Sequence, residues 1–155
     1  MAMLEVGDTA PLFRAPLHDG SEFDLATLIG TRAVVLFFYP KDNTPVCTKE
    51  ACGFRDAYEQ FTAAGAEVIG VSSDSVESHR AFAARHRLPF PIVSDRDRAV
   101  RRLYGVPNTL GVLPGRVTFV IDRQGVIQLV FNGLLASDEH VRRALAVVER
   151  IAAGG

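Results

Sequence analysis

Nearly continuous apolar runs mark the predicted strands of this chain. Three of them are rich in β-branched and aromatic residues, as strands buried on both faces of a sheet are. They are Ala33–Tyr39, Ala66–Ser73 and Gly115–Asp122. A further apolar run, Gly125–Phe131, follows the hairpin-type turn "DRQG" and predicts another strand.

Two shorter segments near the N-terminus, Leu12–Leu17 and Glu22–Leu25, flank the sequence "HDGS". Its Asp19-Gly20 pair is typical of tight hairpin turns, which need residues that tolerate left-handed backbone angles. The pattern therefore predicts an N-terminal β-hairpin.

Helical periodicity marks a second set of segments. They are Pro45–Ala64, Ser75–His86, Arg98–Tyr104 and Ser137–Ala153. Ser75 stands at an N-cap position, and Ser137 precedes two acidic residues that suit a first helical turn. Strands and helices alternate early, and a hairpin and a helix close the chain. This order predicts an α/β fold with a central mixed sheet flanked by helices.

Length and composition agree with a folded domain. The chain has 155 residues, of which 48% are hydrophobic and 23% are charged. We expect residues 1–155 to form one domain with a substantial core. Residues 108–115, "NTLGVLPG", form the one extended loop that the pattern predicts.

Charge and hydropathy argue against several classes of function. With a net charge of −1, the chain has no excess of basic residues that would indicate binding to a nucleic acid or to an anionic membrane surface. No apolar run approaches the roughly 20 residues of a membrane helix, and the N-terminus lacks the pattern of a secretory signal. Two cysteines are too few for a disulfide framework, which favours a reducing compartment. We therefore expect a cytoplasmic protein.

Other candidate sites have weak support. The basic residues Arg98, Arg101 and Arg102 lie beside acidic ones and are interpreted as a solvated helix face. None of the four histidines has metal-ligand spacing, so they are expected on the surface or in packing roles. No phosphate-binding glycine motif occurs.

The cysteines fall in the stretch "FFYPKDNTPVCTKEACGF". Thr44 can cap a helix whose first residue is Pro45, where the missing N–H costs nothing. Cys47 then lies in the first helical turn, where free backbone N–H groups and the positive end of the helix dipole favour a thiolate. A thiolate is the nucleophile that thiol chemistry needs.

Cys52 lies on another side of the same predicted helix. At 100° per residue, Cys47 shares the apolar face with Ala51 and Phe54, whereas Cys52 is turned about 140° away. Five residues of helix place the two Cα atoms about 8 to 9 Å apart. A disulfide needs them within about 7 Å, so the pair can meet only if the helix unwinds.

The residues alone leave more than one interpretation of this pair. Two cysteines without a neighbouring histidine cannot complete a zinc or iron–sulfur site. The spacing is not the C-x-x-C of dithiol oxidoreductases. Two buried bystanders, or a reactive thiol with a partner, remain open.

The segment "YPKDNTPVCTKEAC" resembles the active site of peroxiredoxins, with Pro40, Thr44 and Cys47 matching the pattern P-x-x-x-[TS]-x-x-C. The position of Cys52 resembles the subfamily called peroxiredoxin Q (PrxQ) or bacterioferritin comigratory protein. The segments "GDTAPLFRAPLHDGSEFDL", "EVIGVSSDS" and "GRVTFVIDRQG" resemble other parts of the family, so the likeness covers nearly the whole chain. One departure is Val46, where many members have glycine.

This resemblance implies a thioredoxin-like fold and the reduction of hydrogen peroxide or alkyl hydroperoxides. Cys47 would attack the peroxide and become a sulfenic acid, which Cys52 would resolve as an intramolecular disulfide. Arg116 would favour the thiolate and stabilise the departing oxygen. Thr44 would help to hold the peroxide, and Pro40 would shield the sulfur.

The same resemblance implies further properties of the enzyme. Backbone N–H groups of Val46 and Cys47 would bind the peroxide, and Glu50 would orient an arginine by an ion pair. No metal or organic cofactor is required, and thioredoxin or a similar dithiol protein would supply electrons to a monomeric enzyme. The alternatives are a thiol–disulfide oxidoreductase and a peroxide-sensing redox switch.

Overall fold

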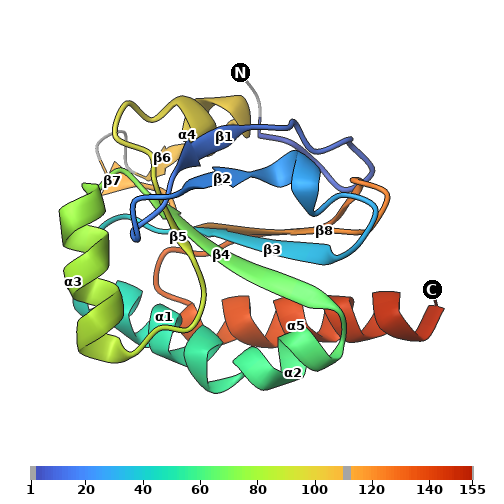
Figure 1. The fold of residues 1–155 in the computed structure, drawn as a ribbon. Coiled ribbons are helices and arrows are strands. Elements are labelled where there is room, and N and C mark those ends of the chain that lie inside the picture. The colour runs from blue at the N-terminus through green and yellow to red at the C-terminus, as the bar shows by residue number, and fades with distance from the viewer. Residues whose placement is uncertain (1–2, 110–112, 155) are drawn as a thin grey trace.

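A mixed sheet forms the centre of the computed structural model, which describes residues 3–109 and 113–154. Within these residues its strand order is β5-β4-β3-β8-β9, with β3, β4 and β5 parallel and β8 and β9 antiparallel to their neighbours (Figure 1). The strands are β3 (Ala33–Phe38), β4 (Ala66–Ser72), β5 (Ile92–Ser94), β8 (Val117–Ile121) and β9 (Ile127–Asn132). The predicted mixed sheet is confirmed.

The central strand β3 shows why its sequence is apolar throughout. Val34, Leu36 and Phe38 face one apolar cluster, and the alternate residues face a second cluster on the other side of the sheet. Helices cover that second side (Figure 1). They are α1 (Pro45–Asp56), α2 (Tyr58–Ala63), α3 (Val76–His86) and α5 (Ser137–Gly154).

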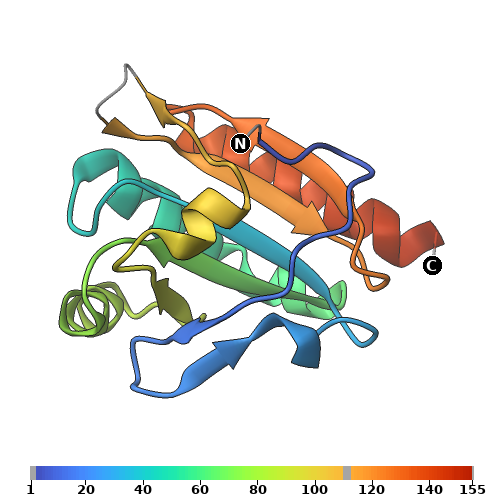
Figure 2. The ribbon, with the colours of Figure 1, turned by 90° about the horizontal axis from the view of Figure 1, so that it is seen from above.

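Shorter elements cover the first side of the sheet, as Figure 2 shows from above. They are β1 (Arg14–Pro16), β2 (Glu22–Asp24), the 3₁₀ turn η1 (Leu25–Thr27) and α4 (Ala99–Leu103). The strands β1 and β2 pair antiparallel as a separate two-stranded sheet, so the predicted N-terminal hairpin is confirmed.

Three elements differ from the prediction. The single helix expected over Pro45–Ala64 is divided into α1 and α2 at Ala57, whose φ and ψ are −95° and 3°. Periodicity does not reveal this break, because Phe54 and Phe61 stay on one side with ring centroids 5.7 Å apart. Strand β5 was not expected, since its three residues are too short for a pattern.

The loop expected over residues 108–115 contains a short antiparallel pair, β6 (Asn108–Thr109) with β7 (Leu113–Pro114). Residues 110–112 lie outside the described part of the chain.

One of the three clustered arginines is not on a solvated face. Arg98 and Arg102 are exposed, but Arg101 is buried because α4 lies across the sheet. Its guanidinium donates to the Gly115 carbonyl at 3.2 Å and lies over the Phe38 ring. Burial lowers the pKa of Arg101 to about 10. The interpretation of this cluster was therefore wrong for Arg101.

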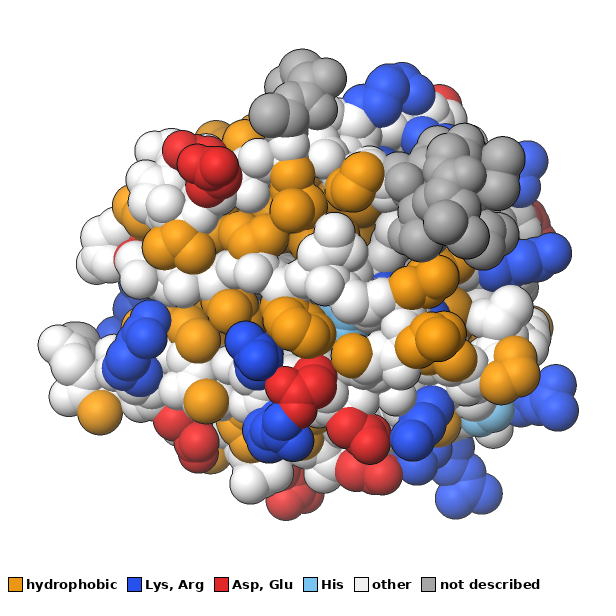
Figure 3. Space-filling view, turned by 180° about the vertical axis from the view of Figure 1, so that it is seen from behind, with side chains coloured by type: hydrophobic (Ala, Val, Ile, Leu, Met, Phe, Trp, Pro, Cys, Tyr) orange, Lys and Arg blue, Asp and Glu red, His pale blue; other side chains and the backbone are white. Residues whose placement is uncertain are grey.

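The outer surface of the helical layer is mixed in charge. Acidic and basic side chains are interspersed along the lower half of the face shown in Figure 3. Among the described residues, no helix has the length and apolar character needed to cross a bilayer.

Candidate active site

The loop after β3 sets the start of α1. Asn43 adopts a left-handed conformation with φ of 64°, which asparagine tolerates better than most residues. Thr44 then occupies the N-cap position and Pro45 the first helical turn, as the sequence predicts. The Thr44 hydroxyl donates to the Lys41 carbonyl at 2.8 Å instead of capping a helix N–H. The first N–H groups of α1 therefore have no side-chain cap from Thr44.

Cys47 lies in that first turn with its side chain in the core. It is 1% exposed and belongs to the same apolar cluster as Ala51 and Phe54 on α1. The Arg116 Nη2 atom lies 3.0 Å from the Cys47 sulfur. Pro40 is half-buried in the preceding loop. The structure thus brings Cys47 and Arg116 together across 69 positions of sequence.

Arg116 is held from several sides. Its Nε donates to the Leu134 carbonyl at 2.6 Å, and its Nη1 lies 2.5 Å from Glu50 Oε1. The preceding residue, Gly115, fits only without a side chain, because an added Cβ would lie 2.4 Å from the Pro107 carbonyl oxygen. Arg116 is 2% exposed, so its guanidinium has a defined position beside the sulfur.

Glu50 is completely buried on α1, and only one of its oxygens has a hydrogen-bond partner. The other oxygen, Oε2, lies 3.6 Å from Nδ1 of His140. Burial raises the pKa of Glu50 to about 7, although the Arg116 cation opposes the shift. The expected contact between Glu50 and an arginine is present, with Arg116 as the arginine.

His140 on α5 extends this buried group. Its Nδ1 lies 2.7 Å from the Thr118 hydroxyl, and its Nε2 lies 2.7 Å from the Gly133 carbonyl oxygen. Burial lowers the pKa of His140 to about 4, so the ring is neutral near neutral pH. From the sequence, His140 was expected only on the surface or in a packing role, and Thr118 was not singled out. The available signal was the position of His140 on the buried face of α5 with Ala144 and Val148.

Cys52 is half-buried on α1, and both cysteines are free thiols. Because α1 is continuous from Pro45 to Asp56, the helical separation of about 8 to 9 Å between their Cα atoms applies. No disulfide joins them, and none can form while α1 is intact.

A second buried polar group lies at the other end of the loop after β3. The Asp42 carboxylate accepts from the hydroxyls of Tyr39 at 2.5 Å and Ser78 at 2.8 Å, and from His79 Nδ1 at 2.7 Å. The other ring nitrogen of His79 faces the Val93 carbonyl at 3.0 Å. Burial raises the pKa of Tyr39 well above its usual value.

Asp42, Asp74 and His79 are also close enough together to hold a metal ion. Their spacing in the sequence gave no sign of this grouping. The atoms that would act as ligands already take part in hydrogen bonds, because Asp74 accepts from the Asp42 N–H and the Ser72 hydroxyl. The group is therefore complete as a hydrogen-bond network.

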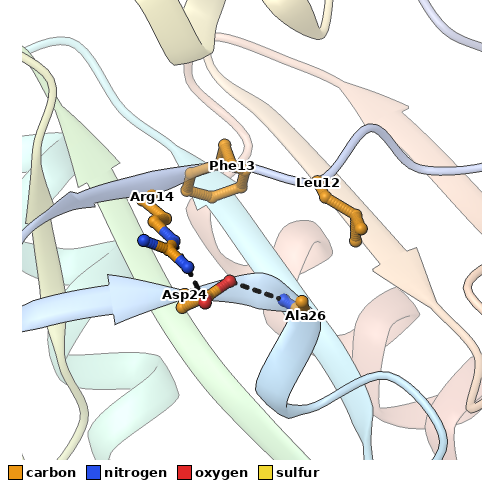
Figure 4. Close-up of a pocket in the computed structure, with 5 residues that line it drawn as sticks. All are labelled: Leu12, Phe13, Arg14, Asp24 and Ala26. Carbon is orange, nitrogen blue, oxygen red and sulfur yellow. Dashed lines mark hydrogen bonds and ion pairs between the residues drawn. The ribbon is translucent and has the colours of Figure 1, made fainter.

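A cavity of about 310 Å³ lies on the opposite side of the sheet from Cys47. Its lining residues are Leu12, Phe13, Arg14, Asp24 and Ala26 (Figure 4). Arg14 and Asp24 form an ion pair at 3.2 Å, and Asp24 accepts from the Ala26 N–H. Both carboxylate oxygens of Asp24 are thus paired, one with Arg14 and one with the Ala26 N–H, and none of the residues that line the cavity belongs to the cysteine site.

Comparisons with known proteins agree with this geometry. The family model described as the AhpC/TSA family matches residues 6–130. The protein named peroxiredoxin Q, chloroplastic, of Sedum lineare is 46% identical over 151 residues, which cover 97% of this chain and 81% of the relative. The protein of that name in Arabidopsis thaliana is 46% identical over 145 residues, which cover 93% and 67%.

Solved structures show the same likeness. The peroxidoxin BcpB of Mycobacterium tuberculosis superposes with a TM-score of 0.88 at 38% identity, covering 96% of this chain and 98% of that one. The bacterioferritin comigratory protein of Xanthomonas campestris, described with alkyl peroxide reduction activity, gives 0.84 at 33% identity, covering 94% and 99%. The expected thioredoxin-like fold is thereby confirmed.

The comparison corrects the expected cytoplasmic location. Relatives in Sedum lineare, Triticum aestivum and Arabidopsis thaliana are named as chloroplastic. The expectation rested on cysteine number and the lack of a secretory pattern. Those features describe the folded domain and one export route, and they do not determine which compartment a cell assigns to the domain.

Proposed function

The chain belongs to the AhpC/TSA family and is a peroxidase of the peroxiredoxin Q type, and on this premise we propose that Cys47 is the residue that peroxide oxidises. The single observation that carries the proposal is the Arg116 guanidinium 3.0 Å from a buried sulfur in the first turn of α1. A cation and a helix N-terminus both stabilise a thiolate at that place.

In the first step the Cys47 thiolate attacks one peroxide oxygen. A sulfur–oxygen bond forms, the oxygen–oxygen bond breaks, and the departing alkoxide takes up a proton to become an alcohol or water. Arg116 stabilises the negative charge that develops on the departing oxygen. The Thr44 hydroxyl and the N–H groups of Val46 and Cys47 bind the peroxide, and Pro40 shields the sulfur from bulk water.

In the second step Cys52 condenses with the sulfenic acid and releases water. Because α1 holds the cysteines apart, its first turns unwind in each cycle, and helix ends open at low free energy. The resulting disulfide is exposed and is reduced by thioredoxin or a similar dithiol protein. Residues 1–155 act as one domain and one subunit, since both cysteines lie on one helix.

Hydrogen peroxide and alkyl hydroperoxides are the proposed substrates. The X. campestris relative supports the alkyl class, because it is described with alkyl peroxide reduction activity. The reaction needs no metal or organic cofactor, since sulfur itself carries the two electrons.

Two serine variants test the roles of the cysteines. Cys47→Ser should consume no peroxide, whereas Cys52→Ser should consume a single equivalent and then stop until a small thiol is added. Peroxide loss and oxidation of NADPH, coupled through thioredoxin and its reductase, are measured for both variants and the wild type.

Equal loss of the first equivalent in both variants would contradict the assignment of Cys47. Wild-type protein that reacts once and stops in the coupled assay would instead indicate a peroxide-sensing switch. Turnover of protein disulfides without peroxide consumption would indicate a thiol–disulfide oxidoreductase.

A further inference from the structure

We infer that Glu50 carries a proton on Oε2 while Cys47 is reduced and releases it when Cys47 is oxidised. The net charge of the buried site then stays the same through the first step. This inference deepens the proposed function and rests on it, because the charge that changes is that of Cys47.

The first argument is the unpaired oxygen of Glu50. Arg116 donates to Oε1, but Oε2 is buried and receives no hydrogen bond. An ionised carboxylate with one buried oxygen unpaired is costly, because that oxygen loses its hydration without compensation. A proton on Oε2 removes most of this cost, since it makes the group neutral and turns the atom into a donor.

The second argument is the tautomer of His140. Its Nε2 faces the Gly133 carbonyl, which can only accept, so Nε2 must carry a hydrogen. In the neutral ring Nδ1 is then an acceptor, and the Thr118 hydroxyl donates to it at 2.7 Å. The ring nitrogen that lies 3.6 Å from Glu50 Oε2 therefore has no hydrogen to donate to this oxygen. His140 thus leaves an ionised Oε2 without a hydrogen bond, which favours a proton on the carboxyl group.

Burial favours the neutral form of both Glu50 and His140. It raises the pKa of Glu50 to about 7 and lowers the pKa of His140 to about 4. Both shifts favour the neutral forms, with the proton on the carboxyl.

The third argument is the charge balance around Arg116. One guanidinium lies between two acidic groups, the Cys47 sulfur at 3.0 Å and Glu50 Oε1 at 2.5 Å. Lys49 and Asp138 form a charged pair between α1 and α5, but their side chains are largely exposed and screened by solvent. Arg116 is the cation that contacts both acidic groups, and one cation balances one anion, so a Cys47 thiolate favours a neutral Glu50.

Oxidation reverses this balance. The thiolate, the peroxide and the protonated Glu50 become the sulfenic acid, the alcohol and the ionised Glu50. A sulfur–oxygen bond forms, the oxygen–oxygen bond breaks, and sulfur loses the two electrons that the peroxide gains. One proton leaves Glu50 and one joins the alkoxide, so the protein and substrate exchange no net proton with the medium.

Infrared difference spectroscopy tests this inference on the Cys52→Ser variant at pH 6, where the cycle stops at the sulfenic acid. Reduced protein should show the carbonyl stretch of a protonated carboxyl group, and one equivalent of hydrogen peroxide should replace it with a carboxylate band. Glu50→Gln in the same background should lack this change. Glu67→Gln is the matched control, because Glu67 is half-buried, accepts from the Tyr58 hydroxyl and lies on β4. It should keep the change.

Proton uptake gives a second measurement. With a pH indicator in weak buffer, Cys52→Ser should take up no net proton when it reduces peroxide. The added Glu50→Gln change should make it take up a proton for each peroxide molecule. If Glu50→Gln does not fold, glutamate labelled with ¹³C at the carboxyl group shifts the band in otherwise unchanged protein and assigns it to a glutamate.

A reduced protein without the protonated carboxyl band would overturn the inference. So would a band that persists after oxidation, or one that Glu67→Gln removes. If Cys52→Ser consumes no peroxide, the proposed role of Cys47 fails, while the band of the reduced protein still reports the protonation of Glu50 independently.

Discussion

The two buried polar networks beside α1 differ in how completely their carboxylates are paired. Both oxygens of Asp42 accept hydrogen bonds, from Tyr39, Ser78 and His79. Glu50 has one paired oxygen and one without a partner. A complete network stabilises one arrangement of the chain. In an incomplete network, an unpaired carboxylate oxygen can bind and release a proton.

The two histidines differ in the same way. His79 faces an acceptor on each side, the Asp42 carboxyl group and the Val93 carbonyl, so each of its two contacts contains a hydrogen. His140 has one acceptor and one donor as partners and is neutral. The Asp42 network is thus a buried, fully paired group that connects the loop after β3 to α3. The Glu50 network is a neutral pair beside the cation that contacts Cys47.

The largest expected effect tests the Asp42 network. His79→Gln should lower the free energy of unfolding by about 3–5 kcal/mol, because it removes the ring nitrogen that lies 2.7 Å from the buried Asp42 carboxyl group. Urea denaturation of the reduced protein measures the change. His140→Gln is the matched variant, and we expect it to cost about 1–3 kcal/mol because only neutral hydrogen bonds are lost. Equal costs would show that the more complete pairing of Asp42 adds no stability.

The second prediction concerns the cation of the Glu50 network. Arg116→Ala should slow the first oxidation step by about 10²–10³-fold, since a positioned donor at the developing charge is lost. Stopped-flow measurement with one equivalent of peroxide gives the rate. Arg116→Lys should recover part of the rate, because lysine keeps the positive charge but lacks the bidentate geometry of the guanidinium group. A wild-type rate in Arg116→Ala would remove Arg116 from the mechanism.

The smallest expected effect is a pair of opposite pH slopes in stability. The raised pKa of Glu50 gives stability that is complete below pH 4.5 and is lost as pH rises through about 7. The lowered pKa of His140 gives stability that is complete above pH 6.5 and is lost as pH falls through about 4. In the wild type these two contributions oppose each other between pH 4.5 and 6.5.

In each single variant, the titratable residue that remains should therefore determine how the unfolding free energy changes with pH. Between pH 4.5 and 6.5, the unfolding free energy of Glu50→Gln should rise with pH and that of His140→Gln should fall. We expect slopes on the order of 1 kcal/mol per pH unit, from urea denaturation at several pH values. Parallel curves for both variants and the wild type would show that the two groups do not titrate in the folded protein.

Local features were predictable wherever neighbouring residues determine them. The helix start at Thr44 and Pro45 is confirmed because an N-cap position and a proline at the first turn depend only on adjacent backbone. The burial of Cys47 and the partial exposure of Cys52 follow from helical periodicity. Arg101 was placed wrongly because three clustered arginines look alike until α4 lies on the sheet.

Contacts between distant parts of the chain were not predictable from the pattern. Strand β3 pairs with β8 so that Phe38 lies opposite Val117, and this register brings the adjoining Arg116 to the end of β3 where α1 begins. His140 reaches Glu50 only because α5 packs against α1, and nothing in the spacing of 90 positions suggests it.

The amino-acid sequence by itself determined the long strands, the helix start just before Cys47, the distance between the two cysteines and, by resemblance, the family. Each of these depends on short-range backbone geometry or on a contiguous motif. The resemblance also pointed to Arg116 as the cation beside Cys47. Tertiary structure alone decided which oxygen of Glu50 stays unpaired and that His140 is neutral. Those properties depend on burial and on hydrogen bonds between segments that come together only when the sheet and its helices are packed.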